Sequence, residues 1–163
     1  MKKFLISAAV LGATVLSTPA LAANNSASAN ASVNIVSPLT LVNDSGLDFG
    51  TVVGPFNGET VRVSNTGSRT CGGLTCSGTP AAANFTVSKG TANQALKVTV
   101  ASTVTLNSGS NSLTVDLSTD LPGALTTDVN GGAKFGVGGS LVIPANTPDG
   151  AYSGQFDVQV DYQ

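Results

Sequence analysis

Two cysteines are the residues of this chain whose types and spacing most directly suggest chemistry. Cys71 and Cys76 lie in the segment CGGLTC, and the chain contains no histidine. A metal site would need more ligands and a thiol redox site would need CxxC spacing, so the pair is predicted to form a structural disulfide that pins a hairpin tip. Because the loop is short, its stabilisation should fall at the low end of the roughly 0–5 kcal/mol range.

Carboxylates are the other groups that could perform chemistry here. Without histidine there is no ready general base, and neither cysteine is expected to be a free nucleophile. Asp44 and Asp48 could contribute to a calcium site, but the chain lacks the ligand spacing of an EF-hand. Most aspartates lie in turn sequences or on the polar side of predicted strands: Asp44, Asp48, Asp116, Asp120, Asp128, Asp149, Asp157 and Asp161. The sequence therefore argues against an enzyme and predicts no cofactor and no metal.

The first 22 residues have the pattern of a secretory signal peptide. A basic start with Lys2 and Lys3 precedes an apolar run, which ends at the small-residue sequence ALA over residues 20–22. The run is too short and wrongly flanked for a transmembrane helix, and a start of this kind is typical of bacteria. Cleavage is expected before Ala23. No second hydrophobic span follows, so we expect an exported protein without membrane insertion.

The predicted mature chain is small and acidic. Removing 22 of the 163 residues leaves 141, the length of one domain, with five basic residues against nine acidic ones. No basic patch is available for nucleic acid or for anionic lipid. Binding to either is therefore not expected.

Alternating apolar residues between turn sequences predict an all-β fold. Valine and threonine are abundant, no stretch has convincing helical periodicity, and turns such as NDSG at 43–46 and VNGG at 129–132 separate the apolar runs. An immunoglobulin-like antiparallel sandwich over residues 38–163 is predicted. Its core should contain Phe85, Val87, Leu96, Val98, Val100, Leu113, Val115, Leu117, Leu141 and Ile143. The predicted strands are 29–36, 38–43, 46–53, 59–65, 83–89, 95–101, 102–107, 111–119, 133–143 and 150–162.

Residues 23–37 differ from the rest of the mature chain. They begin small and polar and continue with an apolar row that increases in size before Pro38 interrupts the pattern. The row consists of Ala27, Ala29, Ala31, Val33 and Ile35. Residues 29–36 could be the first strand of the sandwich, or an extended arm donated to another molecule. Both alternatives are compatible with the pattern.

The C-terminal segment GAYSGQFDVQVDYQ alternates polar and apolar residues almost perfectly from residue 155. Tyr162 is penultimate, and Val160, Val158 and Phe156 are fourth, sixth and eighth from the end, with Gly150 fourteenth. This pattern resembles the C-terminal motif of pilus subunits assembled by the chaperone–usher pathway. In that family the motif forms the chaperone-binding strand.

Two further segments strengthen the resemblance. NASVNIVSPLTLVNDSG is similar to the mature N-terminus of the alternative CS1-like and common-pilus major subunits. LDFGTVV and LVIPANTPDGAYSGQFDVQVDY resemble a family of small exported bacterial β-domains that are thought to be related to fimbrial subunits. The cysteine pair departs from the pattern, because many pilins link two more distant cysteines.

The resemblance implies an incomplete sandwich that lacks its last strand. A periplasmic chaperone would lend a strand to the open groove, and an outer-membrane usher would exchange it for the arm of the next identical or related subunit. The donated side chains would be Ala29, Ala31, Val33 and Ile35. The acceptor edge would contain Gly150, Phe156, Val158, Val160 and Tyr162. The protein would pass through the periplasm to a cell-surface fimbrium or the extracellular space and support adhesion.

An alternative interpretation of the function is compatible with the same predicted strands. The chain could be an autonomous exported β-sandwich, monomeric and acting as a binding or adhesin module. Residues 29–36 would then pair within their own sheet. The sequence does not decide whether these residues pair in cis or in trans.

Overall fold

The computed structural model describes residues 26–119, 121 and 124–163, so the predicted signal peptide lies outside the described residues. The chain divides into two units, residues 1–34 and residues 35–163. The described part of the first unit, residues 26–34, is extended, exposed and free of regular secondary structure. The second unit contains every strand of the described residues.

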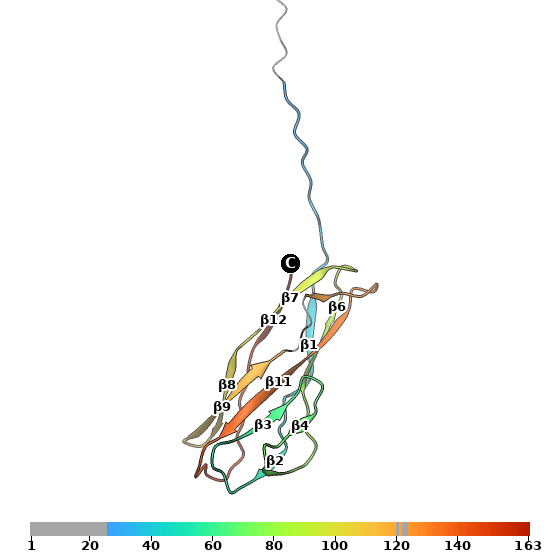
Figure 1. The fold of residues 1–163 in the computed structure, drawn as a ribbon. Helices are drawn as coiled ribbons and strands as arrows, with labels where there is room; N and C mark the ends of the chain where they lie inside the picture. Colours follow the sequence, from blue (N-terminus) through green and yellow to red (C-terminus); the bar gives the residue numbers. More distant parts are fainter. Residues whose placement is uncertain (1–25, 120, 122–123) are drawn as a thin grey trace, which may run out of the picture. The chain divides into compact units, whose positions relative to one another are not determined.

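The second unit is an all-β, sandwich-like domain, as the alternating pattern predicts (Figure 1). Every strand pair in the described residues is antiparallel. No helix in this part of the chain is long and apolar enough to cross a membrane. The strands are β1 (Thr40–Ser45), β2 (Thr51–Val53), β3 (Glu59–Val63), β4 (Arg69–Thr70), β5 (Thr75–Ser77), β6 (Ala83–Ser88), β7 (Ala95–Val100), β8 (Thr103–Ser108), β9 (Asn111–Ser118), β10 (Leu125–Thr126), β11 (Ala133–Ile143) and β12 (Val158–Tyr162).

The long strand β11 joins two parts of the main sheet. Residues 133–137 pair with β6, whereas residues 138–143 pair with β9 and β3. Gly138 lies where the pairing changes, and a Cβ atom there would overlap the backbone of Val63 and Ser64. Glycine is required at this position because two backbones approach closely.

The first core lies between strands β1, β6 and β11 on one side and β10, β7 and β12 on the other (Figure 1). Phe85 and Phe135 stack with ring centroids 5.3 Å apart, and Phe156 meets Phe85 edge-on at 6.5 Å. Its buried residues are Ala83, Phe85, Val87, Leu96, Phe135 and Val137. The predicted alternation of β6 and β7 is confirmed for this core.

The second core lies over strands β8, β9, β3 and the second half of β11. Leu113 and Val115 alternate along β9, and Leu141 and Ile143 alternate along β11, as predicted. The complete buried set is Phe49, Val61, Val63, Val104, Leu113, Val115, Leu141 and Ile143. Strands β2 and β5 form a separate pair whose side chains Val52 and Cys76 pack against this core.

Three predicted strands differ from the structure by more than two residues. The predicted strand 150–162 is wrong in length, because β12 begins at Val158 and the preceding segment makes only an isolated bridge at Ser153. The predicted strand 46–53 is reduced to β2, because the chain turns at Gly50, where φ is 70° and its N–H bonds to the Asp48 carboxylate. Residues 29–36 form no strand in the described structure.

Cys71 and Cys76 form the predicted disulfide. The predicted hairpin tip is wrong, because β4 pairs with β3 whereas β5 pairs with β2. The bond therefore closes the connection between two different sheets. A turn with a backbone bond from Leu74 N–H to Cys71 C=O fills this short loop.

Replacing both cysteines by serine is expected to lower the free energy of unfolding by about 2 kcal/mol, the chain-entropy value for so short a loop. Urea denaturation of the oxidised parent and the double variant measures this difference. A stability equal to that of the parent, or a chain that no longer folds, would contradict this account of the bond.

Candidate functional site

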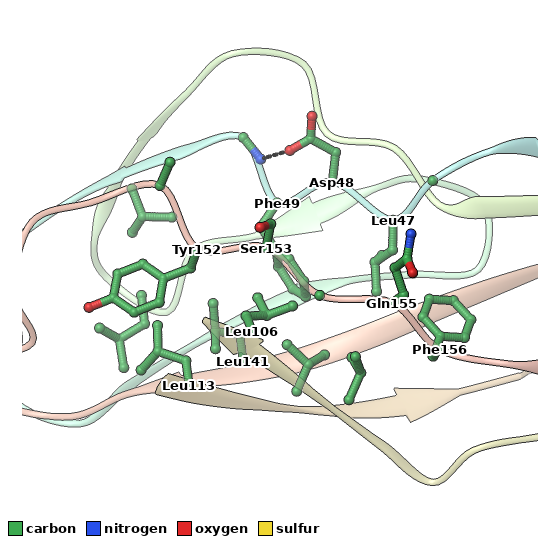
Figure 2. Close-up of a pocket in the computed structure, with 18 of the residues that line it drawn as sticks. Leu47, Asp48, Phe49, Leu106, Leu113, Leu141, Tyr152, Ser153, Gln155 and Phe156 are labelled. Atoms are coloured by element: carbon green, nitrogen blue, oxygen red, sulfur yellow. Dashed lines mark hydrogen bonds between the residues drawn. The ribbon is translucent and has the colours of Figure 1, made fainter. Parts of the chain in front are cut away.

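An open groove of about 1100 Å³ lies over the second core (Figure 2). Its floor is apolar and comes from strands β6, β8, β9 and β11. The floor residues are Ala83, Phe85, Val104, Leu106, Leu113, Val115, Leu141 and Ile143. One wall is the segment 46–52 and the other is the segment 147–157. Two walls without a strand between them leave one stretch of this core open.

The first wall is held by polar contacts to neighbouring segments. Asp48 and Ala81 exchange two backbone hydrogen bonds of 2.8 and 2.9 Å. The guanidinium of Arg69 donates to the carbonyl of Phe49 at 2.7 Å and also to the carbonyls of Ser77 and Gly78. These bonds fix Leu47 and Phe49 above the floor, where Figure 2 shows them pointing into the groove.

Arg69→Ala is expected to lower the free energy of unfolding by about 2–3 kcal/mol, because three backbone carbonyls lose a charged donor. Arg62→Ala is the matched control, since Arg62 lies exposed on the adjacent strand β3. Urea denaturation compares the two variants. Equal losses in both would contradict the role assigned to Arg69.

The second wall is anchored to β8 by backbone hydrogen bonds. Ser153 exchanges backbone bonds of 2.8 and 3.1 Å with Asn107 on β8. The hydroxyl of Tyr152 donates to the carbonyl of Pro148 at 3.0 Å, and Figure 2 shows its ring over Leu113. Phe156 lies at the other end of this segment and contacts both cores.

Both walls present unpaired backbone groups. Within the described residues, no backbone hydrogen bond involves Gly46 or Leu47 on the first wall, or residues 154–156 on the second. β12 continues the second wall as the last strand of its sheet, with β7 on one edge only. Polar backbone groups beside an apolar floor are what an added β-strand requires.

The alternation of bonds along β12 shows which groups face its free edge. The carbonyl of Asp157 accepts, and the N–H of Gln163 donates, in bonds to the side of β7. Hydrogen-bonded positions alternate in an antiparallel pair, so the intervening residues direct their N–H and C=O groups away from β7. These residues are Val158, Val160 and Tyr162.

The groove does not continue along β12, because no β12 residue lines it. Leu39, Leu41, Val160 and Tyr162 pack against the first core and are absent from the groove lining. At that end the Tyr162 hydroxyl donates to the carbonyl of Ser37 at 2.7 Å. The open space is therefore concentrated towards Tyr152.

The predicted acceptor residues divide into two groups. Gly150 and Phe156 line the groove, whereas Val158, Val160 and Tyr162 lie on β12 and pack half-buried against the first core. The sequence reasoning missed Leu47, Phe49, Leu106 and Tyr152 as groove residues. For Tyr152 a signal existed, because it continues the alternate row of Phe156, Val158 and Val160 towards the N-terminus.

The charged groups near the groove lie on its rim. Asp48, Asp149 and Asp157 are exposed. Within the described ranges, no group of three His, Cys, Asp or Glu side chains lies close enough together to hold a metal ion. Beyond the rim, the N–H of Asn57 donates to the Glu59 carboxylate at 2.6 Å, and this bond lowers the pKa of Glu59. The groove itself offers apolar contacts and backbone hydrogen bonds.

A family model described as "Domain of unknown function (DUF4402)" matches residues 39–162. The chain belongs to the DUF4402 family. No curated protein and no solved structure was found to match the chain. The DUF4402 match spans both groove walls and β12, and it begins after Ser37.

The residues that precede the DUF4402 match carry exposed apolar side chains. Val33 and Ile35 are 83% and 84% exposed. Residues 26–43 contain no charged side chain, whereas Asp44 is the first. This segment is therefore uncharged and carries alternate apolar side chains that are exposed to solvent.

Proposed function

We propose that this chain is an exported structural subunit of a bacterial surface fimbrium. Residues 29–36 of one copy enter the groove of a second copy and complete its sheet as an added strand. The observation that carries the proposal is the groove, whose two walls have unpaired backbone groups above an apolar floor. The resemblance of both chain ends to fimbrial subunits supports the same assignment.

The donated strand would be held by two kinds of interaction. Its backbone would pair with the free edges of the walls, and its alternate side chains would enter the apolar space and set the register. Burial contributes about 1.5–3 kcal/mol for each large side chain, so Val33 and Ile35 would together supply roughly 3–6 kcal/mol. The alanines at 29 and 31 would add less.

Head-to-tail addition explains how a filament would form. The donor surface and the acceptor surface are different parts of the chain, so the contact is heterologous and leaves a free groove and a free arm at the ends. Growth is therefore open. A periplasmic chaperone that covers the groove and an outer-membrane usher that exchanges it for an arm are the partners this assembly would use, and the filament would support adhesion.

A synthetic peptide with the sequence of residues 26–36 tests the proposal on the full mature chain. Excess peptide is expected to occupy the groove and stop growth, so light scattering after gel filtration should show capped monomers in place of a ladder of oligomers. A peptide carrying Ile35→Asp is the matched control and should not cap. A stable monomer that ignores both peptides would support the autonomous binding module instead.

A further inference from the structure

Ser37 is held by hydrogen bonds on both of its backbone groups. Its N–H donates to the Thr91 hydroxyl at 2.8 Å, and its carbonyl accepts from the Tyr162 hydroxyl at 2.7 Å. The Tyr162 hydroxyl also accepts from the Thr91 N–H at 2.8 Å. Ser37, Thr91 and Tyr162 therefore form a closed cluster, which we call the Ser37 clamp.

The Ser37 clamp rests on a buried support. The hydroxyl of Thr127, the one buried polar side chain among the described residues, donates to the Thr91 carbonyl at 2.7 Å. The same hydroxyl accepts from the Gln94 N–H at 2.8 Å. The loop that holds Ser37 is thus fixed from within the domain.

The position of the clamp matters for the route of the arm. Ile35 is exposed, whereas Leu39 packs against the first core, so Ser37 marks the point where the chain enters the sandwich. From there β1 runs towards the groove, which Asn43 lines. To fill the groove of its own copy, the arm would have to reverse direction at Ser37 and Pro38.

Backbone chemistry opposes a tight reversal at Ser37 and Pro38. Proline in the third position of a type I turn forces the preceding residue out of the helical region, and types II and I′ require a positive φ that proline cannot adopt. A type VI turn requires a cis bond, and the Ser37–Pro38 bond is trans. A reversal earlier in the arm would place Val33 or Ile35 in the turn rather than in the groove.

A turn one residue later is opposed by the clamp. With Pro38 in the second position, the Ser37 carbonyl would bond to the N–H of Thr40. In the structure that carbonyl is directed at the Tyr162 hydroxyl, and Thr40 is paired with Ser88 in β1. Self-insertion would therefore have to break the clamp and the start of β1.

We infer that the Ser37 clamp, together with Pro38, keeps the arm out of its own groove and reserves it for a second copy of the chain. The inference rests on the proposed donor-strand function. A tethered segment that can reach its site acts at an effective concentration of about 1 mM, so at about 10 µM protein an arm that reached its own groove would favour it about 100-fold over the groove of another copy. A subunit that polymerises needs a barrier of this kind.

The test uses the full mature chain and the double variant Pro38→Gly with Tyr162→Phe, which removes the turn restriction and the clamp hydroxyl but keeps the ring. The matched control is Pro144→Gly with Thr114→Val, which alters a proline and a hydroxyl at exposed positions that do not line the groove. Each protein is refolded over a range from about 0.1 to about 10 µM, so that intramolecular closure, which is independent of concentration, separates from association.

We expect the parent and the control to form oligomers whose yield rises with concentration. The double variant should instead give monomers whose own arm fills the groove, in a yield that does not depend on concentration. These closed monomers should not bind the 26–36 peptide. Oligomers in the parental yield from a double variant that still accepts the peptide would overturn the inference. If the double variant stays monomeric but still binds the peptide, its groove is open, and this outcome also overturns the inference.

The same experiment would give a different result if the proposed donor-strand function itself were wrong. The parent itself would then remain a monomer at every concentration and would not bind the peptide. In that case the parent and the double variant would behave alike. Whether the parent forms oligomers therefore distinguishes an error in the proposed function from an error in the inference about the Ser37 clamp.

Discussion

Ile35→Asp is expected to abolish polymer formation while leaving the folded domain intact. Ile35 is 84% exposed, so an aspartate there stays solvated in the single subunit. In the groove of a neighbour the same carboxylate would be buried without a partner, which costs several kcal/mol. A loss of about 4 kcal/mol lowers the association constant by about a thousandfold.

Asn34→Asp is the matched control for this variant. Asn34 belongs to the polar row of the arm, so its side chain would face away from the groove floor in an added strand. Light scattering after gel filtration, combined with urea denaturation, measures association and folding separately. Equal loss of polymer in both variants, or unfolding of the Ile35→Asp domain, would contradict the donor role of Ile35.

Phe85→Ala is expected to give the largest loss of stability. Phe85 stacks on Phe135, contacts Phe156 and contributes to the groove floor, so its removal affects both the first core and the groove. Truncation of a buried phenylalanine costs about 3–5 kcal/mol. Since small domains are stable by only about 5–15 kcal/mol, this change should remove a large part of the domain's stability.

A bound strand should restore part of that loss. Ligands that bind only the folded state stabilise it by mass action, so excess 26–36 peptide should raise the denaturation midpoint of Phe85→Ala. Val142→Ala on the exposed side of β11 is the control and should change stability by less than about 1 kcal/mol. Circular dichroism during urea denaturation measures both. A Phe85→Ala domain as stable as the control would contradict the assignment of Phe85 to the core.

Alternation was sufficient to predict the central strands. In β9 and β11 the apolar residues Leu113, Val115, Leu141 and Ile143 follow a period of two, and their buried positions agree with it. The disulfide was also predictable, because two cysteines in a short segment have few other uses. Its surroundings were not, since spacing alone does not say that β4 and β5 pair with different strands.

The groove could be predicted only in part. Phe156 belongs to the alternating C-terminal row, but the opposite wall is built by Leu47 and Phe49 from a segment that alternation presents as a plain strand. Three-dimensional information was needed because Arg69 and Ala81, distant in sequence, hold that wall away from the second one. The bonding of Ser37 to Tyr162 spans 125 residues and has no local signature.

Cross-linking between differently labelled copies tests the central claim most directly. An isotopically heavy mature chain with a small diazirine-bearing aliphatic residue at position 33 is refolded with light chain, irradiated and analysed by mass spectrometry. We expect heavy-to-light links that join position 33 to the groove walls, residues 46–52 and 147–157. Links confined to single chains, or heavy-to-light links to the outer face of β8 and β9, would contradict the account.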